Sequence, residues 1–323
     1  MGQAIIIHQH GGPEVLRLEP LALGEPAPGE LRLRQTAVGV NYHDVYVRSG
    51  LYRTLTLPGT PGLEGVGVVE AVGSGVTGFG PGDRIGYVDG RYGAYATHKL
   101  VAADQAVRLP DGVDDALAAS LLIKGLTAQI LTQRVHPITA GERVLVHAAA
   151  GGVGALLVQL AAGMGAEVIG TAGSPEKAEI ARGLGCRAVI LYRQEDFAER
   201  VRALTGGAGA DVVFDAVGRD TFDGSLASLA LRGHLVNYGQ ASGPIPPFDI
   251  SRLAPKSATL TRPGYSHYLE TPERLRTAAA ALFQSVLDGA LRPERPRSWP
   301  LAQAGEAHAA LERRERGPFI LVP

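Results

Sequence analysis

The sequence predicts an α/β protein with two parts, a β-rich region followed by a doubly wound parallel sheet of six strands. Short apolar segments separated by glycine turns fill residues 3–73, which is typical of β structure. From Arg143 onward such segments alternate with helix-like segments, the pattern of parallel sheets with crossover helices. A length of 323 residues also favours two domains over one.

Alternating or β-branched residues mark the strands of the first part. These strands are expected at Gln3–His8, Glu14–Glu19, Glu30–Gly39 and Gly65–Gly73. A helix is expected next, over Ala116–Gln133, because that stretch is apolar and holds no glycine or proline except Gly125.

Six apolar strands form the predicted parallel sheet. They are expected at Arg143–His147, Ala166–Thr171, Ala188–Leu191, Asp211–Gly218, His234–Gly239 and Ser257–Thr261. Helices are expected between them, at Ala155–Gly165, Ser174–Gly185, Glu195–Gly207 and Thr221–Gly233. A long helix at Glu273–Gly289 and a final helix and strand complete the chain.

Composition excludes several classes of protein. A net charge of −1 argues against a nucleic-acid-binding protein, which usually carries a basic patch. The single cysteine, Cys186, can form neither an intrachain disulfide nor a four-cysteine zinc site. The apolar runs are shorter than a membrane span, and the N-terminus lacks the pattern of a signal peptide. A cytoplasmic protein without a membrane partner is therefore expected.

A glycine-rich turn follows the first strand of the predicted sheet and opens a helix. Gly151 and Gly152 allow the backbone to approach a pyrophosphate, Val153 continues the turn, and Gly154 allows close helix–sheet packing. The helix N-terminus offers free N–H groups to an anion. The turn therefore predicts a dinucleotide site, with a plain tight turn as the alternative.

The end of the second strand indicates which dinucleotide binds. NAD-binding sheets usually place an acidic residue there for the ribose 2′-hydroxyl. Here the sequence continues with Gly173 and Ser174, and Lys177 and Tyr192 follow, with no acid before Glu176. A hydroxyl and an ammonium without a carboxylate suit a 2′-phosphate, so NADPH is the predicted cofactor. Alternatively, Lys177 is an ordinary solvated lysine.

Several segments together resemble one known family, the zinc-free NADPH:quinone reductase (ζ-crystallin-like) branch of the medium-chain dehydrogenase/reductases. The resemblance covers nearly the whole chain. Its segments are His10–Leu16, Val38–Tyr52, Gly67–Ile85, Lys124–Ala128, His147–Gly154, Asp215–Phe222 and the pattern that ends at His308.

This resemblance implies a domain organisation and an activity. It implies a GroES-like catalytic domain from residues 1–123 and 266–323, and a Rossmann NADPH-binding domain from residues 124–265. It further implies an active site in the cleft between them, a homodimer, and metal-free reduction of quinones by NADPH.

Zinc is not expected. Zinc-dependent relatives carry G-x-C-x-x-D and G-H-E at two ligand positions, and this chain has Asn41 and Leu63 in place of the cysteine and histidine. Neither can ligate as a thiolate or an imidazole would. His43 and Asp44 remain, with a structural or nicotinamide-proximal role expected for them. Without zinc, a conjugated acceptor such as a quinone is the expected substrate.

The resemblance also implies which residues take part in the reaction. Asn41 is expected at the nicotinamide, and Tyr46 and Tyr52 are expected to line the acceptor pocket. Lys124 and Thr127 lie on the helix that the family places under the nicotinamide. The alternatives are helix-face packing for the two tyrosines and an ordinary salt bridge for Lys124.

Further cofactor contacts are carried over by position to the ends of the later strands and to the C-terminus. They are Val217, Tyr238, Gly239, Gln240, Gly264, Tyr265 and Arg313. Arg314 or Arg316 is the alternative to Arg313. His147 is expected to be a buried, satisfied histidine.

Other functions remain open. An enzyme of the same fold that reduces an alkenal, an enone or an enoyl thioester would need the same NADPH site. A cofactor-binding structural or RNA-binding protein is the alternative from another class. The last strand of the sheet, Ser257–Thr261, has no lysine or glutamate to protect its edge, and this favours pairing in a homodimer.

Overall fold

A computed structural model describes residues 2–323, which divide into two compact units. The first unit comprises residues 1–124, 270–288 and 293–323, and the second comprises residues 125–269 and 289–292. The segment Gly289–Arg292 groups with the second unit because Gln159 holds it there: the Arg292 N–H donates to Gln159 Oε1 at 2.8 Å. The predicted division, with boundaries at 123/124 and 265/266, assigned this segment to the first domain instead.

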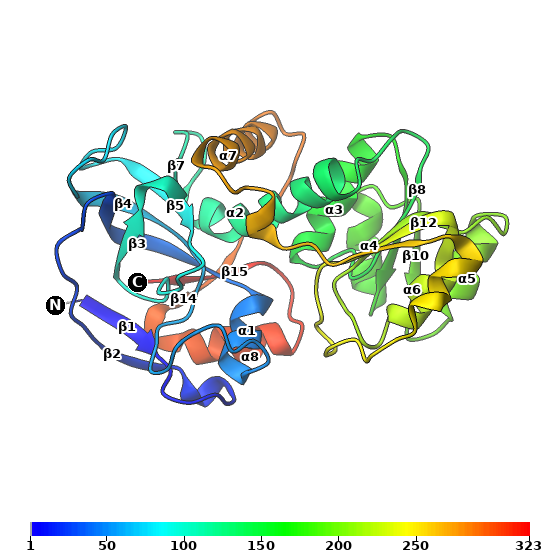
Figure 1. Cartoon of the computed structure of the whole chain (residues 1–323), viewed down its shortest axis with the longest axis horizontal. Helices are drawn as coiled ribbons and strands as arrows, with labels where there is room; N and C mark the ends of the chain where they lie inside the picture. The colour runs from blue at the N-terminus through cyan, green and yellow to red at the C-terminus, as the bar shows by residue number, and fades with distance from the viewer. Residues whose placement is uncertain (1) are drawn as a thin grey trace. The chain divides into compact units, whose positions relative to one another are not determined.

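The first unit contains a seven-stranded sheet and a separate two-stranded ribbon (Figure 1). The ribbon pairs β1 (Gly2–Ile6) with β2 (Arg17–Leu21). The larger sheet has the order β14-β15-β3-β4-β5-β7, with β6 paired to β3. Its strands are β3 (Glu30–Val40), β4 (Glu64–Val72), β5 (Arg84–Val88), β6 (His98–Ala102), β7 (Ala106–Arg108), β14 (Arg297–Pro300) and β15 (Phe319–Val322).

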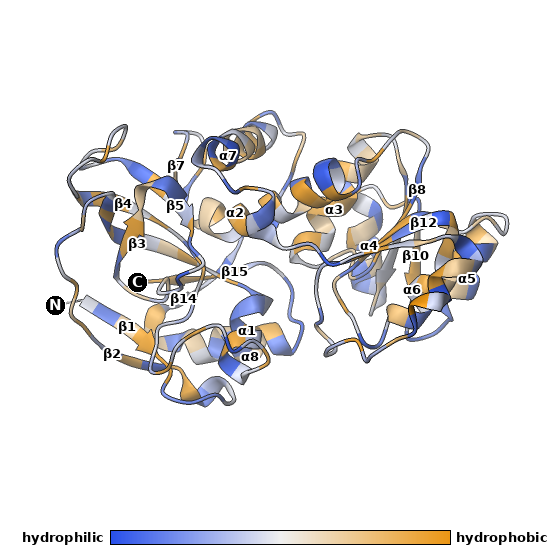
Figure 2. Ribbon diagram, in the orientation of Figure 1, coloured by the Kyte–Doolittle hydropathy of each residue, from blue (hydrophilic) through white to orange (hydrophobic). Residues whose placement is uncertain are grey.

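Helices complete the first unit. They are α1 (Tyr42–Ser49), α7 (Pro272–Leu287), α8 (Ala304–Glu312) and the first part of α2 (Asp115–Ile130). Alternating side chains of β3 are buried, and Figure 2 shows hydrophobic residues along this strand. Leu31, Leu33 and Val38 belong to a core that also includes Phe319 from the C-terminal strand. Segments from both ends of the chain thus build one hydrophobic core.

The second unit contains the predicted parallel sheet of six strands, with the order β10-β9-β8-β11-β12-β13. The strands are β8 (Arg143–Val146), β9 (Glu167–Ala172), β10 (Ala188–Leu191), β11 (Ala210–Asp215), β12 (Leu229–Asn237) and β13 (Thr259–Thr261). The connecting helices are α3 (Gly152–Gly163), α4 (Pro175–Gly183), α5 (Phe197–Leu204) and α6 (Phe222–Ser228). All neighbouring pairs are parallel, which confirms the predicted doubly wound sheet.

Several element boundaries were predicted wrongly. The strand expected at Glu14–Glu19 begins only at Arg17 and runs to Leu21, because Pro13–Val15 form a 3-10 turn, and the strand expected to reach Gly218 ends at Asp215. The helix expected to reach Gly233 ends at Ser228, and β12 begins at Leu229. Leu229 leaves helical geometry with φ −64° and ψ 146°, and the register of β11 and β12 shifts near this point. Within β12, Arg232 has a φ of 61°, which a helix would not allow. The last strand begins at Thr259 rather than Ser257, because Ser257 has a φ of 47° and closes a 3-10 helix, Ile250–Lys256.

The apolar helix in the middle of the chain is longer than expected. With its final π-helical turn it covers Asp115–Val135, and by length and composition alone it could cross a membrane. Most of it is buried within the protein, as in the core helix of a folded domain.

Candidate active site

The carboxyl ends of the parallel strands form one edge of the second unit. Strand order reverses between β8 and β11, and ligands of doubly wound sheets bind at such a reversal. The predicted cofactor residues follow these strands in the chain. The structure therefore brings the predicted residues of the second unit to a single edge.

The turn after β8 has the shape of an anion cradle. A Cβ on Gly154 would lie 2.2 Å from the Ala148 carbonyl oxygen, so no larger residue fits where α3 packs on the strand. Gly151 caps α3 without any side-chain hydrogen bond. The first N–H groups of a helix have no intrahelical partner, so those of Gly152 and Val153 suit a phosphate. These residues fit the pyrophosphate of a dinucleotide.

Four predicted residues gather beyond β9. A Cβ on Gly173 would lie 2.8 Å from the Tyr192 hydroxyl, so glycine lets that phenol approach the backbone. Ser174 caps α4 and accepts a hydrogen bond from the Lys177 N–H at 3.4 Å. The Ser174 hydroxyl also hydrogen-bonds Glu176, which holds the pKa of that carboxyl below its usual range. Glu176, the first acid after this strand, thus shares the serine that was predicted to contact the 2′-phosphate.

A buried aspartate that sequence reasoning missed shapes the turn after β11. Asp215 is fully buried, and its Oδ1 accepts hydrogen bonds from the N–H groups of Val217 at 2.7 Å and Gly218 at 3.1 Å. The Thr221 hydroxyl donates to the same oxygen at 2.9 Å. The sequence carried a signal for this role: an aspartate directly before a turn can accept hydrogen bonds from the backbone N–H groups two and three residues later.

The ends of β12 and β13 carry the other predicted residues of this unit. The Tyr238 N–H donates to the Asp215 carbonyl oxygen at 2.9 Å. A Cβ on Gly239 would lie 2.6 Å from the Ala216 carbonyl oxygen, so the two turns touch through their backbones. Gln240 follows directly, Gly264 and Tyr265 follow β13, and Thr127 lies on α2.

A polar cluster in the first unit connects two predicted residues through a third that was not singled out. Asn41 Nδ2 donates to Glu64 Oε1 at 2.8 Å, and Lys124 Nζ lies 3.5 Å from the same oxygen. The Ile123 N–H donates to Glu64 Oε2 at 2.7 Å. Glu64 is fully buried, and burial raises the pKa of its carboxyl although Lys124 opposes this. Its position at the start of β4, after a glycine turn, was the available signal.

The residues at this cluster do not fit a zinc ion. Asn41 uses its amide on Glu64, and Leu63 offers no ligand atom. The ammonium of Lys124 supplies a positive charge beside Glu64. Across residues 2–323, no group of three or more His, Cys, Asp or Glu side chains is placed to share a metal ion.

A cluster of aromatic rings lies along α1, in the loop after it and in the turn after β5. The rings of Tyr46 and Tyr52 lie 5.0 Å apart edge to face, and Tyr42 lies 5.5 Å from Tyr46. His43 Nε2 lies 3.0 Å from the Tyr92 hydroxyl, and burial lowers the pKa of His43 to about 4, so its ring is neutral. Such rings present flat apolar faces with polar edges. Tyr42 and Tyr92 were not predicted. Tyr42 lies one helical turn from Tyr46 on α1, so the i, i+4 spacing was an available signal, whereas Tyr92 joins the cluster only through tertiary packing.

The C-terminal arginines differ in their partners. Arg313 is largely exposed, and its guanidinium bonds Glu315 at 2.7 Å. Arg316 pairs with Glu294 at 2.7 Å. Arg314 hydrogen-bonds Tyr42, next to the aromatic cluster. The geometry thus favours Arg314, the alternative, as the arginine nearest the candidate site.

His147 and Cys186 are buried side chains. His147 Nδ1 lies 3.1 Å from Thr171 Oγ1 and its Nε2 lies 3.0 Å from Ser225 Oγ, so both ring nitrogens have partners. Burial raises the pKa of Cys186 to about 12, which leaves the thiol unreactive.

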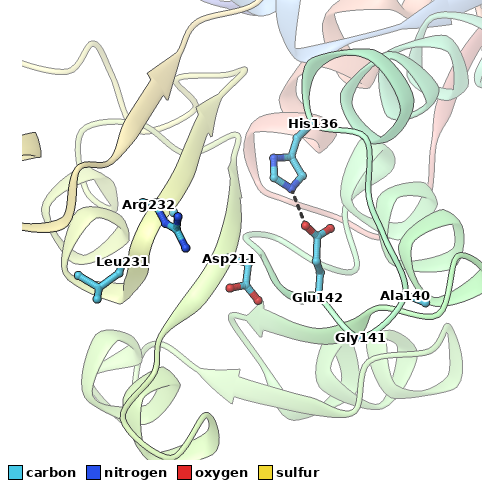
Figure 3. A pocket seen from close by; sticks show the side chains of 8 residues that line it. His136, Ala140, Gly141, Glu142, Asp211, Leu231 and Arg232 are labelled. Atoms are coloured by element: carbon cyan, nitrogen blue, oxygen red, sulfur yellow. Dashed lines mark ion pairs between the residues drawn. The ribbon is translucent and has the colours of Figure 1, made fainter.

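A pocket of about 460 Å³ lies elsewhere in the second unit (Figure 3). His136, Glu142, Asp211 and Arg232 line it, and His136 Nε2 lies 3.4 Å from Glu142 Oε1. Glu142 and Asp211 stand at the amino ends of β8 and β11, so this pocket is at the opposite end of the strands from the glycine turn. We assign no function to it.

Together these features define a dehydrogenase or reductase with a dinucleotide-binding sheet. Residues 27–111 match the alcohol dehydrogenase GroES-like domain, and residues 152–284 match the zinc-binding dehydrogenase family. The chain is 44% identical to a quinone oxidoreductase from Pseudomonas aeruginosa and 40% identical to a 2-haloacrylate reductase from a Burkholderia species. Both alignments cover the whole chain and 99–100% of the relative.

A solved structure agrees in fold. The crystal structure of Escherichia coli quinone oxidoreductase complexed with NADPH superposes with a TM-score of 0.97 at 39% identity, covering 99% of this chain and 100% of the other. The chain therefore belongs to the medium-chain dehydrogenase/reductase family, as its sequence motifs predicted. It is an oxidoreductase with a GroES-like domain and a Rossmann domain.

Proposed function

We propose that this protein is an NADPH-dependent quinone reductase that works without a metal. The observation that carries the proposal is the full-length likeness to quinone oxidoreductases, one of them solved with NADPH. The glycine cradle and the cluster of Ser174, Lys177 and Tyr192 support NADPH as the cofactor. Bound NADPH would supply the hydride.

We propose roles for the chain's own residues on both sides of this reaction. Gly151, Gly152, Val153 and Gly154 hold the pyrophosphate through backbone N–H groups. Ser174, Lys177 and Tyr192 surround the 2′-phosphate, next to Gly173. The remaining cofactor contacts are Thr127, Val217, Tyr238, Gly239, Gln240, Gly264, Tyr265 and an arginine, Arg313 or, as the Tyr42 contact favours, Arg314.

On the acceptor side, Tyr46 and Tyr52 offer faces on which a quinone ring stacks and hydroxyls that hydrogen-bond its oxygens. Asn41 contacts the nicotinamide, and Glu64 holds the Asn41 amide in one orientation. Lys124 supplies positive charge toward the oxygen on which negative charge develops.

A second candidate function is reduction of an activated C=C bond. The 2-haloacrylate reductase, whose named substrate is a conjugated acid, favours it. A metal-free site with one ammonium suits either acceptor, because conjugation in the acceptor stabilises the charge that hydride addition creates.

Steady-state NADPH oxidation tests these functions. The acceptor panel is 1,4-benzoquinone, 9,10-phenanthrenequinone, 2-alkenals, 2-chloroacrylate and crotonyl-CoA, with NADH as the control cofactor. The highest kcat/KM with the quinones is expected. A preference for 2-chloroacrylate or an alkenal selects the second function. Flat rates with every acceptor overturn both and favour a structural or RNA-binding role.

We also propose a cytoplasmic homodimer without nucleic-acid or membrane partners. A net charge of −1 supports the absence of nucleic acid. The position of β13 supports the dimer. It is the last strand in the sheet of the second unit, so its outer edge can pair with the same strand of a second copy.

A further inference from the structure

A fully buried carboxyl, that of Asp44, lies in the first turn of α1. Asp44 Oδ2 accepts hydrogen bonds from the Asn41 N–H at 2.9 Å and from the Tyr95 hydroxyl at 3.0 Å. Asp44 Oδ1 is buried and makes no hydrogen bond within residues 2–323. Half of this carboxyl is thus satisfied and half is not, which is costly for a charged group.

The hydrogen bonds that reach Asp44 run in one direction. Arg48 Nη1 lies 3.4 Å from His308 Nδ1, and a guanidinium only donates, so Nδ1 is the acceptor. Burial lowers the pKa of His308 to about 3, so the neutral ring carries its hydrogen on Nε2. That nitrogen, 2.8 Å from the Tyr95 oxygen, donates to it. The single Tyr95 hydrogen is then committed to Asp44.

Every charge around Asp44 already has a partner. Arg48 makes two hydrogen bonds to Glu312, at 2.7 and 3.1 Å, and Lys124 pairs with Glu64. Asp44 receives only neutral donors. The charged and titratable groups that face this region are Arg48 from α1, Glu64 from β4, Tyr92, Tyr95, Lys124 from α2, and His308 and Glu312 from α8.

Asp44 is therefore the one carboxyl of this group, among the described residues, that has no ion-pair partner. Ionising it adds a buried negative charge without a cation of its own. Burial accordingly raises the pKa of Asp44 to about 7, although the Asn41 N–H and the Tyr95 hydroxyl lower it. This carboxyl changes charge within the range in which an enzyme works.

Asn41 links Asp44 to the candidate site. Its backbone N–H is bound by Asp44, and its side-chain Nδ2 is bound by Glu64. The two buried carboxyls thus hold the two ends of one residue. A second negative charge at Asp44 attracts Lys124 in competition with Glu64, which disturbs both the ion pair and the asparagine.

We propose that Asp44 is a positioning residue of this enzyme. While its carboxyl is neutral, Glu64 keeps both Lys124 and the Asn41 side chain in place; ionisation of Asp44 draws Lys124 away from Glu64 and so loosens that side chain, although the Asn41 N–H stays bound to Asp44. The chain of hydrogen bonds from Arg48 through His308 and Tyr95 controls this step. The proposal rests on the proposed function, because its effect is read through turnover. It extends that function by assigning the pH dependence of the reaction to a group that touches neither cofactor nor acceptor.

Three variants test it. D44N keeps an oxygen that accepts both hydrogen bonds but cannot ionise. Y95F removes one donor from Asp44 and changes nothing else in shape. Y87F is the matched control, because Tyr87 is equally buried in the same unit, and its hydroxyl donates to Gln35 outside this chain of hydrogen bonds.

Two quantities are measured against pH for each protein. Infrared absorption of the protonated carboxylic acid reports the charge of Asp44 directly, and kcat/KM for NADPH-dependent quinone reduction reports the positioning. In the wild type we expect the band to disappear around pH 7 and kcat/KM to fall about tenfold over the same range. In Y95F both midpoints rise by about one pH unit, because the carboxylate has lost a donor. D44N lacks the band and keeps kcat/KM constant, and Y87F matches the wild type.

The outcomes separate the two proposals. A Y95F midpoint that moves in the infrared but not in kcat/KM overturns the positioning role alone, as does a D44N variant with the wild-type pH profile. A protein that reduces no acceptor overturns the proposed function, and with it the role of Asp44. Y95F keeps the test decisive if D44N fails to fold.

Discussion

Lys124 Nζ lies 3.5 Å from Glu64 Oε1, with side chains that are 11% and 0% exposed. An ammonium and a carboxylate this deeply buried depend on each other. Each has lost hydration free energy, and only the opposite charge beside it offsets that loss. Loss of either partner should therefore destabilise the first unit, whatever part Lys124 takes in the reaction.

Lys124→Met is expected to destabilise the first unit by about 3–5 kcal/mol, because it leaves Glu64 buried without a cation. Glu64→Gln in the same chain should recover most of this loss, since it removes the orphaned charge. Thermal unfolding of the wild type, both single variants and the double variant measures the coupling. Additive effects of the two substitutions would contradict the pairing.

Lys177→Ala is expected to raise the KM for NADPH by roughly one to two orders of magnitude, because it removes a charge-assisted contact worth about 1.5–3 kcal/mol. The KM for NADH should hardly change, since NADH has no 2′-phosphate. Steady-state kinetics with both cofactors gives the comparison. Equal losses for the two would show that Lys177 does not recognise the phosphate.

Dialysis against a chelator is expected to leave activity unchanged, because Asn41 and Leu63 cannot ligate zinc and Lys124 provides the local positive charge. Activity is compared before and after dialysis, with elemental analysis of the protein. Stoichiometric zinc whose removal abolishes turnover would overturn this prediction.

A histidine pair makes the second unit sensitive to acid. His136 Nδ1 and His234 Nδ1 lie 3.1 Å apart. Burial and, to a smaller extent, the nearby His136 lower the pKa of His234 to about 4. The unfolded chain binds a proton near pH 6.5 and the folded chain near pH 4, so the stability due to neutral His234 is full above pH 6.5 and is lost as the pH falls toward 4. The wild type should therefore lose more thermal stability between pH 7 and pH 5 than His234→Gln does. Equal losses in the two proteins would exclude His234 as the cause.

The wild type is expected to scatter light as a dimer of the 33.7 kDa chain at micromolar concentration. Thr259→Lys should shift it toward the monomer, because a two-fold contact between β13 strands places two like charges near each other. Thr259 is exposed, whereas Leu260 packs on the core of the second unit, so Leu260→Pro would also unsettle the fold. A wild-type monomer at this concentration would refute the dimer.

Local signals predicted the sheet of the second unit and the glycine turn that follows its first strand. Gly154 marks a close approach of backbone, because a Cβ there would lie 2.2 Å from the Ala148 carbonyl oxygen, and the glycine is visible in the sequence. The six-stranded sheet follows from alternation of strands and helices. The prediction failed at Leu229–Gly233, where strand pairing and the unusual φ of Arg232 override a helix-like composition.

The acceptor half could be predicted only in part. Motifs singled out Asn41 and Lys124 as candidates. Glu64, which bonds both, follows a glycine turn, but it lies 23 and 60 residues from them in sequence, so no local pattern names its partners. The same is true of Tyr92 beside His43. Such clusters arise when distant segments pack together, and one sequence does not encode that proximity in any local pattern.

Strand β15 completes the sheet of the first unit, since it pairs with β3, and α8 brings His308 to Tyr95. During synthesis, the first unit therefore cannot be completed until these segments, which follow the second unit in the chain, have left the ribosome. The second unit is encoded before them and is free to fold earlier. Until β15 emerges, the end of β3 at Val38–Val40 lacks its partner strand, so a nascent or truncated chain should need chaperone protection that the folded protein does not.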